Sequence, residues 1–228
     1  MPDPNLRLLE EAAKKLAPFL GEIVFIGGVT LGLLITDKAA APIRSTDDVD
    51  VIAEILTYAD YIAFSMRLRR AEFTEDTSEE PLTCRWFHGK LKLDVLALSK
   101  EVLGYTNIWY ESALHHAISF VLPSGQPIRM ITAPYFLGTK MEAFRGRGQM
   151  DFLASHDLED FVAVIDGRST ILAEIADSPG DVREYLAEAA RSLLSESRFL
   201  DAVPGFVLDD GRVPLILERL NRLTQLNA

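Results

Sequence analysis

The sequence predicts an α+β fold, with a mixed sheet and flanking helices in residues 1–132 and a helical C-terminal part in residues 133–228. Short apolar runs typical of strands alternate with helix-like stretches in the first part, whereas the second part shows helical spacing with little strand signal. The composition, with 48% hydrophobic and 25% charged residues, is that of a globular protein. A chain of 228 residues can bury its apolar surface without disulfides or a structural metal.

The elements of the first part follow from periodicity and turn residues. Leucine and alanine recur at helical spacing from the N-terminus to Gly21, and Gly27-Gly28 ends the first short apolar run. His88-Gly89 is typical of a hairpin turn between two strands. The expected helices cover residues 6–20, 29–35 and 58–70, a loop covers 36–45, and the expected strands cover 22–26, 48–55, 82–87, 90–98, 118–121 and 128–131.

The second part begins at Pro134 and reads as a series of helices. Asp157 and Asp181 stand near the starts of two of them, where the helix dipole favours negative charge. The expected helices cover residues 135–145, 156–165, 181–194 and 214–226.

The charge balance limits the classes of partner. A formal net charge of −11 repels the nucleic-acid backbone, so extensive non-specific nucleic-acid binding is not expected. Basic residues do cluster within 67–70 and 140–147, where a local groove could still hold phosphates. The N-terminus lacks the basic region and apolar core of a secretory signal, and no apolar run is long enough to cross a bilayer. These features predict a cytoplasmic protein with no membrane partner.

Three acidic residues form the main candidate for chemistry. Asp48 and Asp50 alternate with valines on an expected strand, so both carboxylates project from one face, while Asp47 points away. Asp94 interrupts an otherwise apolar strand, where an unpaired charge is costly. Carboxylates held close together repel unless a cation lies between them, so removing one acid is expected not to lower stability without metal. If the two strands are neighbours, the three acids can bind Mg²⁺, with Mn²⁺ as an alternative.

The Gly27-Gly28 turn is the second candidate feature. Glycine lets backbone N–H groups approach a phosphate closely, and the start of the following helix favours negative charge. Thr30 is positioned to add a hydroxyl contact. A strand, a glycine turn, a helix and a strand with paired acids together predict a site for phosphate and metal.

These residues carry a family resemblance. The run from Gly27-Gly28 through Arg44-Ser45-Thr46-Asp47-Asp48-Val49-Asp50, followed by Asp94, resembles the DNA polymerase beta-type nucleotidyltransferase superfamily. The Arg-x-Thr-x-Asp-x-Asp form, together with residues 140–145 and 156–161, is similar to the bacterial branch that contains abortive-infection and type IV toxin–antitoxin nucleotidyltransferases. The resemblance implies a polymerase-beta-like core of mixed sheet and flanking helices, followed by a helical part.

The resemblance also implies nucleotide-binding roles that the residues alone leave open. Lys140 and Asp157 occupy positions that help form the nucleotide site in that branch, and Arg145 follows on the same helix as Lys140. From the sequence, Lys140 can equally be a solvated helix residue, and Asp157 can equally be a helix N-cap. Arg44 can either contact the nucleotide or hold its loop by bonding carbonyl groups. Arg145 and Arg147 are weaker candidates for substrate contact.

The leading hypothesis is therefore an enzyme that moves a nucleoside monophosphate from an NTP to a hydroxyl acceptor. That acceptor can be a tRNA 3′ end, a protein or a small molecule, and the acidic balance favours the last two. The resemblance favours tRNA or a partner protein, with a cognate toxin or antitoxin in a toxin–antitoxin or phage-defence setting. The alternatives are a nucleotide-binding regulatory or interaction module without turnover, and a purely structural interaction protein.

Overall fold

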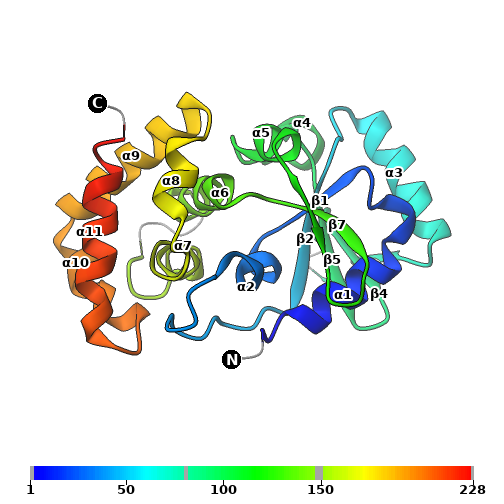
Figure 1. The fold of residues 1–228 in the computed structure, drawn as a ribbon. Coiled ribbons are helices and arrows are strands. Elements are labelled where there is room, and N and C mark those ends of the chain that lie inside the picture. The colour runs from blue at the N-terminus through cyan, green and yellow to red at the C-terminus, as the bar shows by residue number, and fades with distance from the viewer. Residues whose placement is uncertain (1–2, 80–81, 147–150, 227–228) are drawn as a thin grey trace. The chain divides into compact units, whose positions relative to one another are not determined.

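The six expected strands and one short strand that was not predicted, β3, form one seven-stranded mixed sheet in the computed structural model of the protein, which describes residues 3–79, 82–146 and 151–226 (Figure 1). The strand order is β3-β4-β5-β2-β1-β7-β6. β2 runs parallel to β5 and antiparallel to β1, which in turn runs parallel to β7. The strands are β1 (Ile23–Ile26), β2 (Asp48–Ala53), β3 (Thr74–Glu75), β4 (Arg85–His88), β5 (Leu91–Leu96), β6 (Ile118–Val121) and β7 (Pro127–Met130).

The two faces of the central strands differ in character. Helices α1 (Leu6–Lys15) and α3 (Tyr58–Arg70) lie along one face (Figure 1), where Lys15 Nζ is 2.8 Å from His88 Nδ1 and the Arg69 guanidinium lies 5.8 Å from the Trp86 ring centre. Val49 and Val51 are fully buried, and Asp48 and Asp50 are half-buried. The predicted alternation along β2 is therefore confirmed, with the carboxylates on one face and the valines on the other.

One predicted helix is shorter than its apolar pattern indicates. The helix expected over 6–20 ends at Lys15 and is followed by the 3₁₀ turn η1 (Ala17–Phe19). Pro18 lacks an N–H group and disfavours the α conformation at the residue before it, so the helix cannot continue through this position. The other helical segments before residue 132 are η2 (Gly28–Thr30), α2 (Leu31–Leu34), α4 (Lys100–Leu103) and α5 (Tyr110–His115).

Residues after 132 are helical, as predicted. α9 packs against both α6 and α11, burying small and apolar residues such as Leu186 and Ala190. In the part of the chain that the structure describes, no helix is both long and apolar enough to cross a membrane. The segments are α6 (Ala133–Arg145), α7 (His156–Gly167), α8 (Ile171–Ala176), α9 (Gly180–Ser195), α10 (Ser197–Ala202), η3 (Val203–Phe206), η4 (Asp210–Arg212) and α11 (Val213–Leu223).

The described chain divides into two compact units. The sheet unit contains residues 3–32 and 44–132, and the helical unit contains residues 33–43 and 133–226. One division between the units falls between residues 132 and 133, and the segment 33–43 groups with the helices. The backbone N–H groups of Thr36 and Asp37 donate to Gly167 O at 2.9 and 2.8 Å, which ties this segment to the end of α7.

Candidate functional site

The three acids predicted to act together belong to neighbouring strands of the sheet unit. In the parallel pairing of β2 with β5, Asp50 lies directly opposite Asp94 and Asp48 lies opposite Lys92. Asp94 is only 8% exposed, as expected for an acid embedded in a buried strand. The Thr46 hydroxyl donates to Asp48 Oδ1 at 2.8 Å and fixes that carboxylate. The strand register thus brings Asp48, Asp50 and Asp94 onto one face.

Arg85 occupies this acidic face from the adjacent strand β4. It lies opposite Asp94 in the antiparallel register of β4 and β5. Its Nε donates to Asp94 Oδ1 and its Nη2 donates to Asp94 Oδ2, each at 2.8 Å, while Nη2 also reaches Asp48 Oδ2 at 3.2 Å. The hydrogen bonds to Asp94 raise the pKa of Arg85 above its ordinary value. The positive charge of Arg85 therefore offsets the negative charges of Asp48 and Asp94, two of the three carboxylates.

The fit of this face to a divalent cation rests on its donors. Carboxylate oxygens are the ligands that Mg²⁺ prefers, so the donor set is chemically suitable. The guanidinium of Arg85, bound to Asp48 and Asp94, shows that the face accommodates positive charge. Within residues 3–79, 82–146 and 151–226, no group of three or more His, Cys, Asp or Glu side chains is arranged to hold a metal ion.

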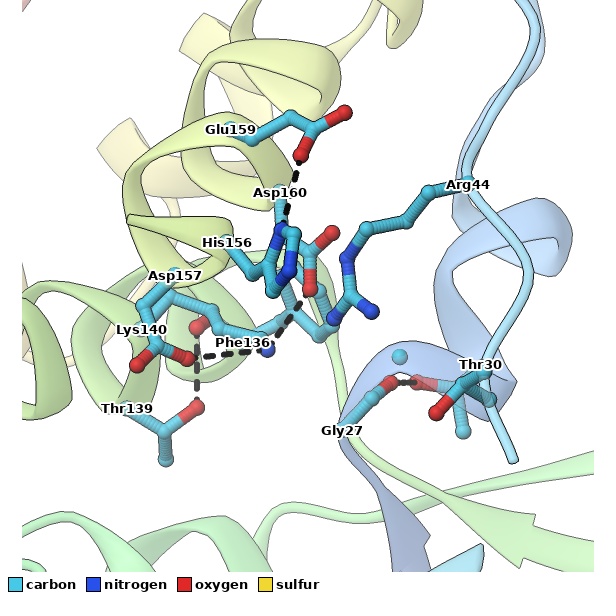
Figure 2. A network of polar contacts seen from close by, with 12 residues as sticks. Gly27, Thr30, Arg44, Phe136, Thr139, Lys140, His156, Asp157, Glu159 and Asp160 are labelled. Atoms are coloured by element: carbon cyan, nitrogen blue, oxygen red, sulfur yellow. Dashed lines mark hydrogen bonds and ion pairs between the residues drawn. The ribbon is translucent and has the colours of Figure 1, made fainter. Parts of the chain in front are cut away.

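Gly27 is required by the position of Asp50. Its φ of +70° is unfavourable for residues with a side chain, and a Cβ atom there would lie 2.1 Å from Asp50 Oδ2. The Thr30 hydroxyl donates to Gly27 O at 2.9 Å (Figure 2), and Thr30 is fully buried. In this structure the Thr30 hydroxyl closes the turn. The helix expected over 29–35 is only the short η2 and α2, so its dipole contributes little negative-charge preference.

Arg44 and Gly28 lie together beside this turn. A Cβ atom on Gly28 would come within 3.2 Å of Arg44 Nη2, so the guanidinium packs closely over the glycine. Asn5 organises the backbone here, because its Nδ2 donates to Gly28 O at 3.2 Å and to Arg44 O at 3.1 Å, and its Oδ1 accepts from Thr46 N at 2.9 Å. The buried Asn5 amide thereby joins the glycine turn to the loop that leads into β2.

Cys84 lies immediately before β4. It is 3% exposed, its backbone oxygen accepts a hydrogen bond from Val95 N at 2.8 Å, and its Sγ accepts one from the Tyr105 hydroxyl at 3.0 Å. Burial raises the pKa of the Cys84 thiol above its ordinary value. Cys84 therefore packs in the interior beside the acidic face.

Lys140 lies in the interior of the helical unit, where it pairs with two acids of α7. Its Nζ is 3.1 Å from Asp157 Oδ1 and 2.6 Å from Asp160 Oδ2 (Figure 2). Lys140 is only 7% exposed, so the interpretation as a solvated helix residue is wrong. The N-cap interpretation of Asp157 is also wrong, because Ser155 caps α7 and its side chain accepts from Leu158 N. Ser155 flanks the first helical residue, which is the N-cap position, whereas Asp157 lies inside the first turn of α7.

Arg145 ends α6 and stacks on an aromatic ring of the same unit. Its guanidinium lies 5.1 Å from the ring centre of Tyr185, whose hydroxyl donates to Glu142 Oε2 at 2.8 Å. Burial raises the pKa of Tyr185 above its ordinary value. This contact holds α6 against α9. Arg147 lies outside the described residues.

The sequence indicated no role for Asn5 or Arg85, and Asp160 was noted only as part of the segment 156–161. The two-residue turn of this hairpin is Gly89-Lys90, one residue later than the predicted His88-Gly89. The predicted turn would have set Arg85 opposite Lys92, so the pairing of Arg85 with Asp94 did not follow from it. Asp160 stands three residues after Asp157, which places both acids on one side of a helix. No local pattern marks Asn5, because its partners are distant in the sequence.

No protein-family model matches the chain, and no curated protein matches it in sequence. Among solved structures, it is similar to an antigenic nucleotidyltransferase-like protein from Paracoccidioides brasiliensis, with 16% identity, a TM-score of 0.46 and coverage of 89% of this chain and 93% of that chain. It is also similar to JHP933 from Helicobacter pylori, with 13% identity, a TM-score of 0.49 and coverage of 97% and 90%. Because both TM-scores lie below 0.5, we assign neither an activity nor a residue role from these likenesses.

Proposed function

We propose that the protein is a metal-dependent nucleotidyltransferase that transfers a nucleoside monophosphate from an NTP to a hydroxyl group. The observation that supports this most is the register of β2 and β5, which sets Asp50 opposite Asp94 with Asp48 on the same face. The glycine turn at Gly27, fitted closely against Asp50, adds a backbone element suited to phosphate. Paired acids that can hold divalent ions beside such a turn suit phosphoryl transfer.

In this proposal Asp48, Asp50 and Asp94 hold Mg²⁺ or Mn²⁺. The bound ions would lower the pKa of the attacking hydroxyl and neutralise charge on the phosphates and the leaving pyrophosphate. Gly27 and Gly28 shape the backbone next to Asp50, and Arg44 provides a guanidinium over Gly28 that can pair with a phosphate oxygen. Lys140, Arg145 and Asp157 remain proposed nucleotide contacts on the strength of the family resemblance alone.

A second candidate function is nucleotide binding without turnover. The pairing of Arg85 with both oxygens of Asp94 favours it, because a carboxylate bound this way is not free to bind an ion. Presence or absence of covalent transfer separates the two candidates.

The net charge of the protein narrows the class of acceptor only in part. The net charge of −11 favours a protein hydroxyl or a small molecule over a long nucleic acid. The family resemblance favours a tRNA 3′ end or a partner protein in a toxin–antitoxin or phage-defence setting. Each of these acceptors is therefore included in the test.

The test incubates the full chain with each α-labelled NTP and Mg²⁺, in the presence of total cellular RNA, of a protein lysate, or of neither. We expect label to become covalently attached to one acceptor class, and Asp50→Asn to abolish that transfer. Asp47→Asn is the matched control, since Asp47 is an exposed acid in the loop before β2 and its removal changes the net charge equally. Transfer that survives in a folded Asp50→Asn protein would refute the assignment of Asp50.

A further inference from the structure

We infer that the Arg85 guanidinium competes with divalent cations for Asp48 and Asp94, so that tight metal binding depends on the phosphates of the substrate. This inference rests on the proposed function, because it concerns the same acids. It adds a regulatory role for a residue that the proposed reaction does not otherwise use.

The first reason is the geometry of the guanidinium. Arg85 grips Asp94 with two parallel hydrogen bonds of 2.8 Å, which is the strongest arrangement that an arginine makes with a carboxylate. The same Nη2 atom reaches Asp48 Oδ2 at 3.2 Å. The Arg85 guanidinium therefore lies between carboxylate oxygens of Asp48 and Asp94 that a divalent ion would need as ligands.

The second reason is that the backbone of Arg85 is fixed while its side chain reaches solvent. Arg85 pairs with Asp94 in the ladder, and its backbone also bonds Leu82 O at 2.9 Å and Asp76 N at 3.1 Å. Its side chain remains 21% exposed, so it borders solvent. Release of the acids thus requires only side-chain rotation, with β4 unchanged.

The third reason is chemical. A guanidinium binds phosphate with the same planar two-point geometry with which it binds a carboxylate. A triphosphate near Asp48 and Asp94 offers Arg85 an alternative partner and also supplies oxygen ligands for Mg²⁺. Without nucleotide, the Arg85 guanidinium repels an incoming metal ion. With nucleotide, the guanidinium can bind a phosphate instead of the carboxylates, so it no longer competes with the ion.

The experiment measures Mn²⁺ binding to the full chain by the electron paramagnetic resonance signal of the free ion. The titration is run without nucleotide and with α,β-methylene analogues of the four NTPs. Without nucleotide, we expect Arg85→Gln to bind Mn²⁺ roughly tenfold more tightly than the wild type. With the analogues, we expect this difference to shrink, because the wild type no longer holds Asp94 with Arg85.

Two further variants sharpen the test. Arg69→Gln is the matched control, because Arg69 is an exposed arginine that pairs with Glu75 and packs toward Trp86 on the opposite face of β4. It should bind Mn²⁺ like the wild type. Arg85→Lys keeps the charge but loses the two-point grip, so it should fall between wild type and Arg85→Gln. If Arg85→Gln does not fold, Arg85→Lys decides the question by the same criterion.

The outcomes distinguish this inference from the proposed function. A folded Arg85 variant that binds Mn²⁺ no more tightly than wild type without nucleotide overturns the inference. If wild type still binds Mn²⁺ with the analogues, and Asp50→Asn abolishes that binding, the proposed function survives this failure. If no variant binds Mn²⁺ under any condition, both are overturned.

Discussion

Arg85 and Lys140 each stand between two carboxylates, but in different surroundings. The Arg85 side chain is 21% exposed and grips its acids through a planar group, whereas the Lys140 side chain is 8% exposed and acts as a point charge. A buried charge that loses its partner is far more costly than an exposed one. Lys140 should therefore matter more for folding, and Arg85 more for the chemistry of its site.

Replacement of Lys140 by methionine is expected to destabilise the helical unit by about 3–5 kcal/mol, the usual cost of removing one partner from a buried pair. The reason is that Asp157 and Asp160 lose the cation that lies 3.1 and 2.6 Å from them. Urea unfolding followed by circular dichroism measures this loss. Lys38→Met, which removes an exposed lysine of the same unit, is the control and should change stability little.

The same Lys140→Met protein also tests the nucleotide-binding role. If Lys140 contacts the triphosphate, calorimetric titration with Mg²⁺ and NTP should show weaker binding under conditions where the variant is folded. Unchanged affinity together with lower stability would leave Lys140 a purely structural residue.

Asp94 shows where an argument from the sequence fails at the level of single residues. The sequence predicts that clustered acids repel, so that losing one is harmless to stability without metal. Arg85 reverses this expectation for Asp94, because removal of that carboxylate leaves a half-buried guanidinium without its main partner. The repulsion argument assumed a cluster of like charges, and the structure has a mixed one.

At the scale of elements, a short loop segment is tied to the end of α7 by one arginine. Arg212 Nε donates to Asp166 Oδ1 at 2.8 Å, and its Nη2 donates to Asp37 Oδ2 at 2.8 Å. The backbone N–H of Ala39 and the Arg212 guanidinium lower the pKa of Asp37, whereas burial raises the pKa of Asp166. The two acids therefore contribute to the pH dependence of folding with opposite signs.

We expect Asp37→Asn to lower the free energy of unfolding at pH 7 by at most about 1 kcal/mol, as for other partly exposed ion pairs. Because the folded pKa of Asp37 lies below its ordinary value of 3.8, its contribution is complete above that value and is lost as the pH falls through the folded pKa. The stability difference from wild type should therefore vanish in acid. Denaturant unfolding from pH 7 down to about pH 2, below the folded pKa, measures it.

The control for this titration is Asp201→Asn, which removes an exposed acid of the same unit. A difference between wild type and Asp37→Asn that stays constant down to the lowest pH would contradict the assigned role of the Asp37 carboxylate.

Elements with strong periodicity were predictable, and those defined by distant contacts were not. α3 spans Tyr58–Arg70 as predicted, because its apolar spacing and the Thr57 N-cap are local signals. β3 has only two residues and α8 only six, so neither is long enough to show the alternation of a strand or the 3.6-residue spacing of a helix. The same division holds in the site: Asp48 and Asp50 share a face through local alternation, whereas Asn5 joins segments that are far apart in the chain.

At the scale of the whole molecule, the chain passes from the sheet unit into the helical unit and back again before it ends in the helical unit. The segment 33–43 leaves the sheet unit, belongs to the helical unit, and is followed by a return to the sheet unit at residue 44. Ile35 packs on Gly167 so closely that a Cβ atom there would lie 2.8 Å from Ile35 Cδ1. A boundary at residue 132 therefore separates the secondary-structure types but divides one unit.

It follows that residues 133–228 alone should not form a stable domain. We expect this fragment to unfold at a lower temperature than the same fragment fused through a flexible linker to residues 33–43, since the fusion restores the cover over Gly167 and the partner of Arg212. Thermal unfolding followed by circular dichroism compares them. A fusion with a scrambled 33–43 sequence controls for the linker, and equal midpoints for all three proteins would contradict the prediction.

The single cysteine gives the molecule a natural chemical reporter. A thiol reagent attacks only the exposed thiolate. Cys84 is buried, and burial raises the pKa of its thiol. Its modification rate in the native protein therefore measures how often local opening exposes this thiol, which lies immediately before β4. Since the sequence contains no other cysteine, that rate can be followed in the unaltered chain, with any bound ligand that closes the site registering as slower labelling.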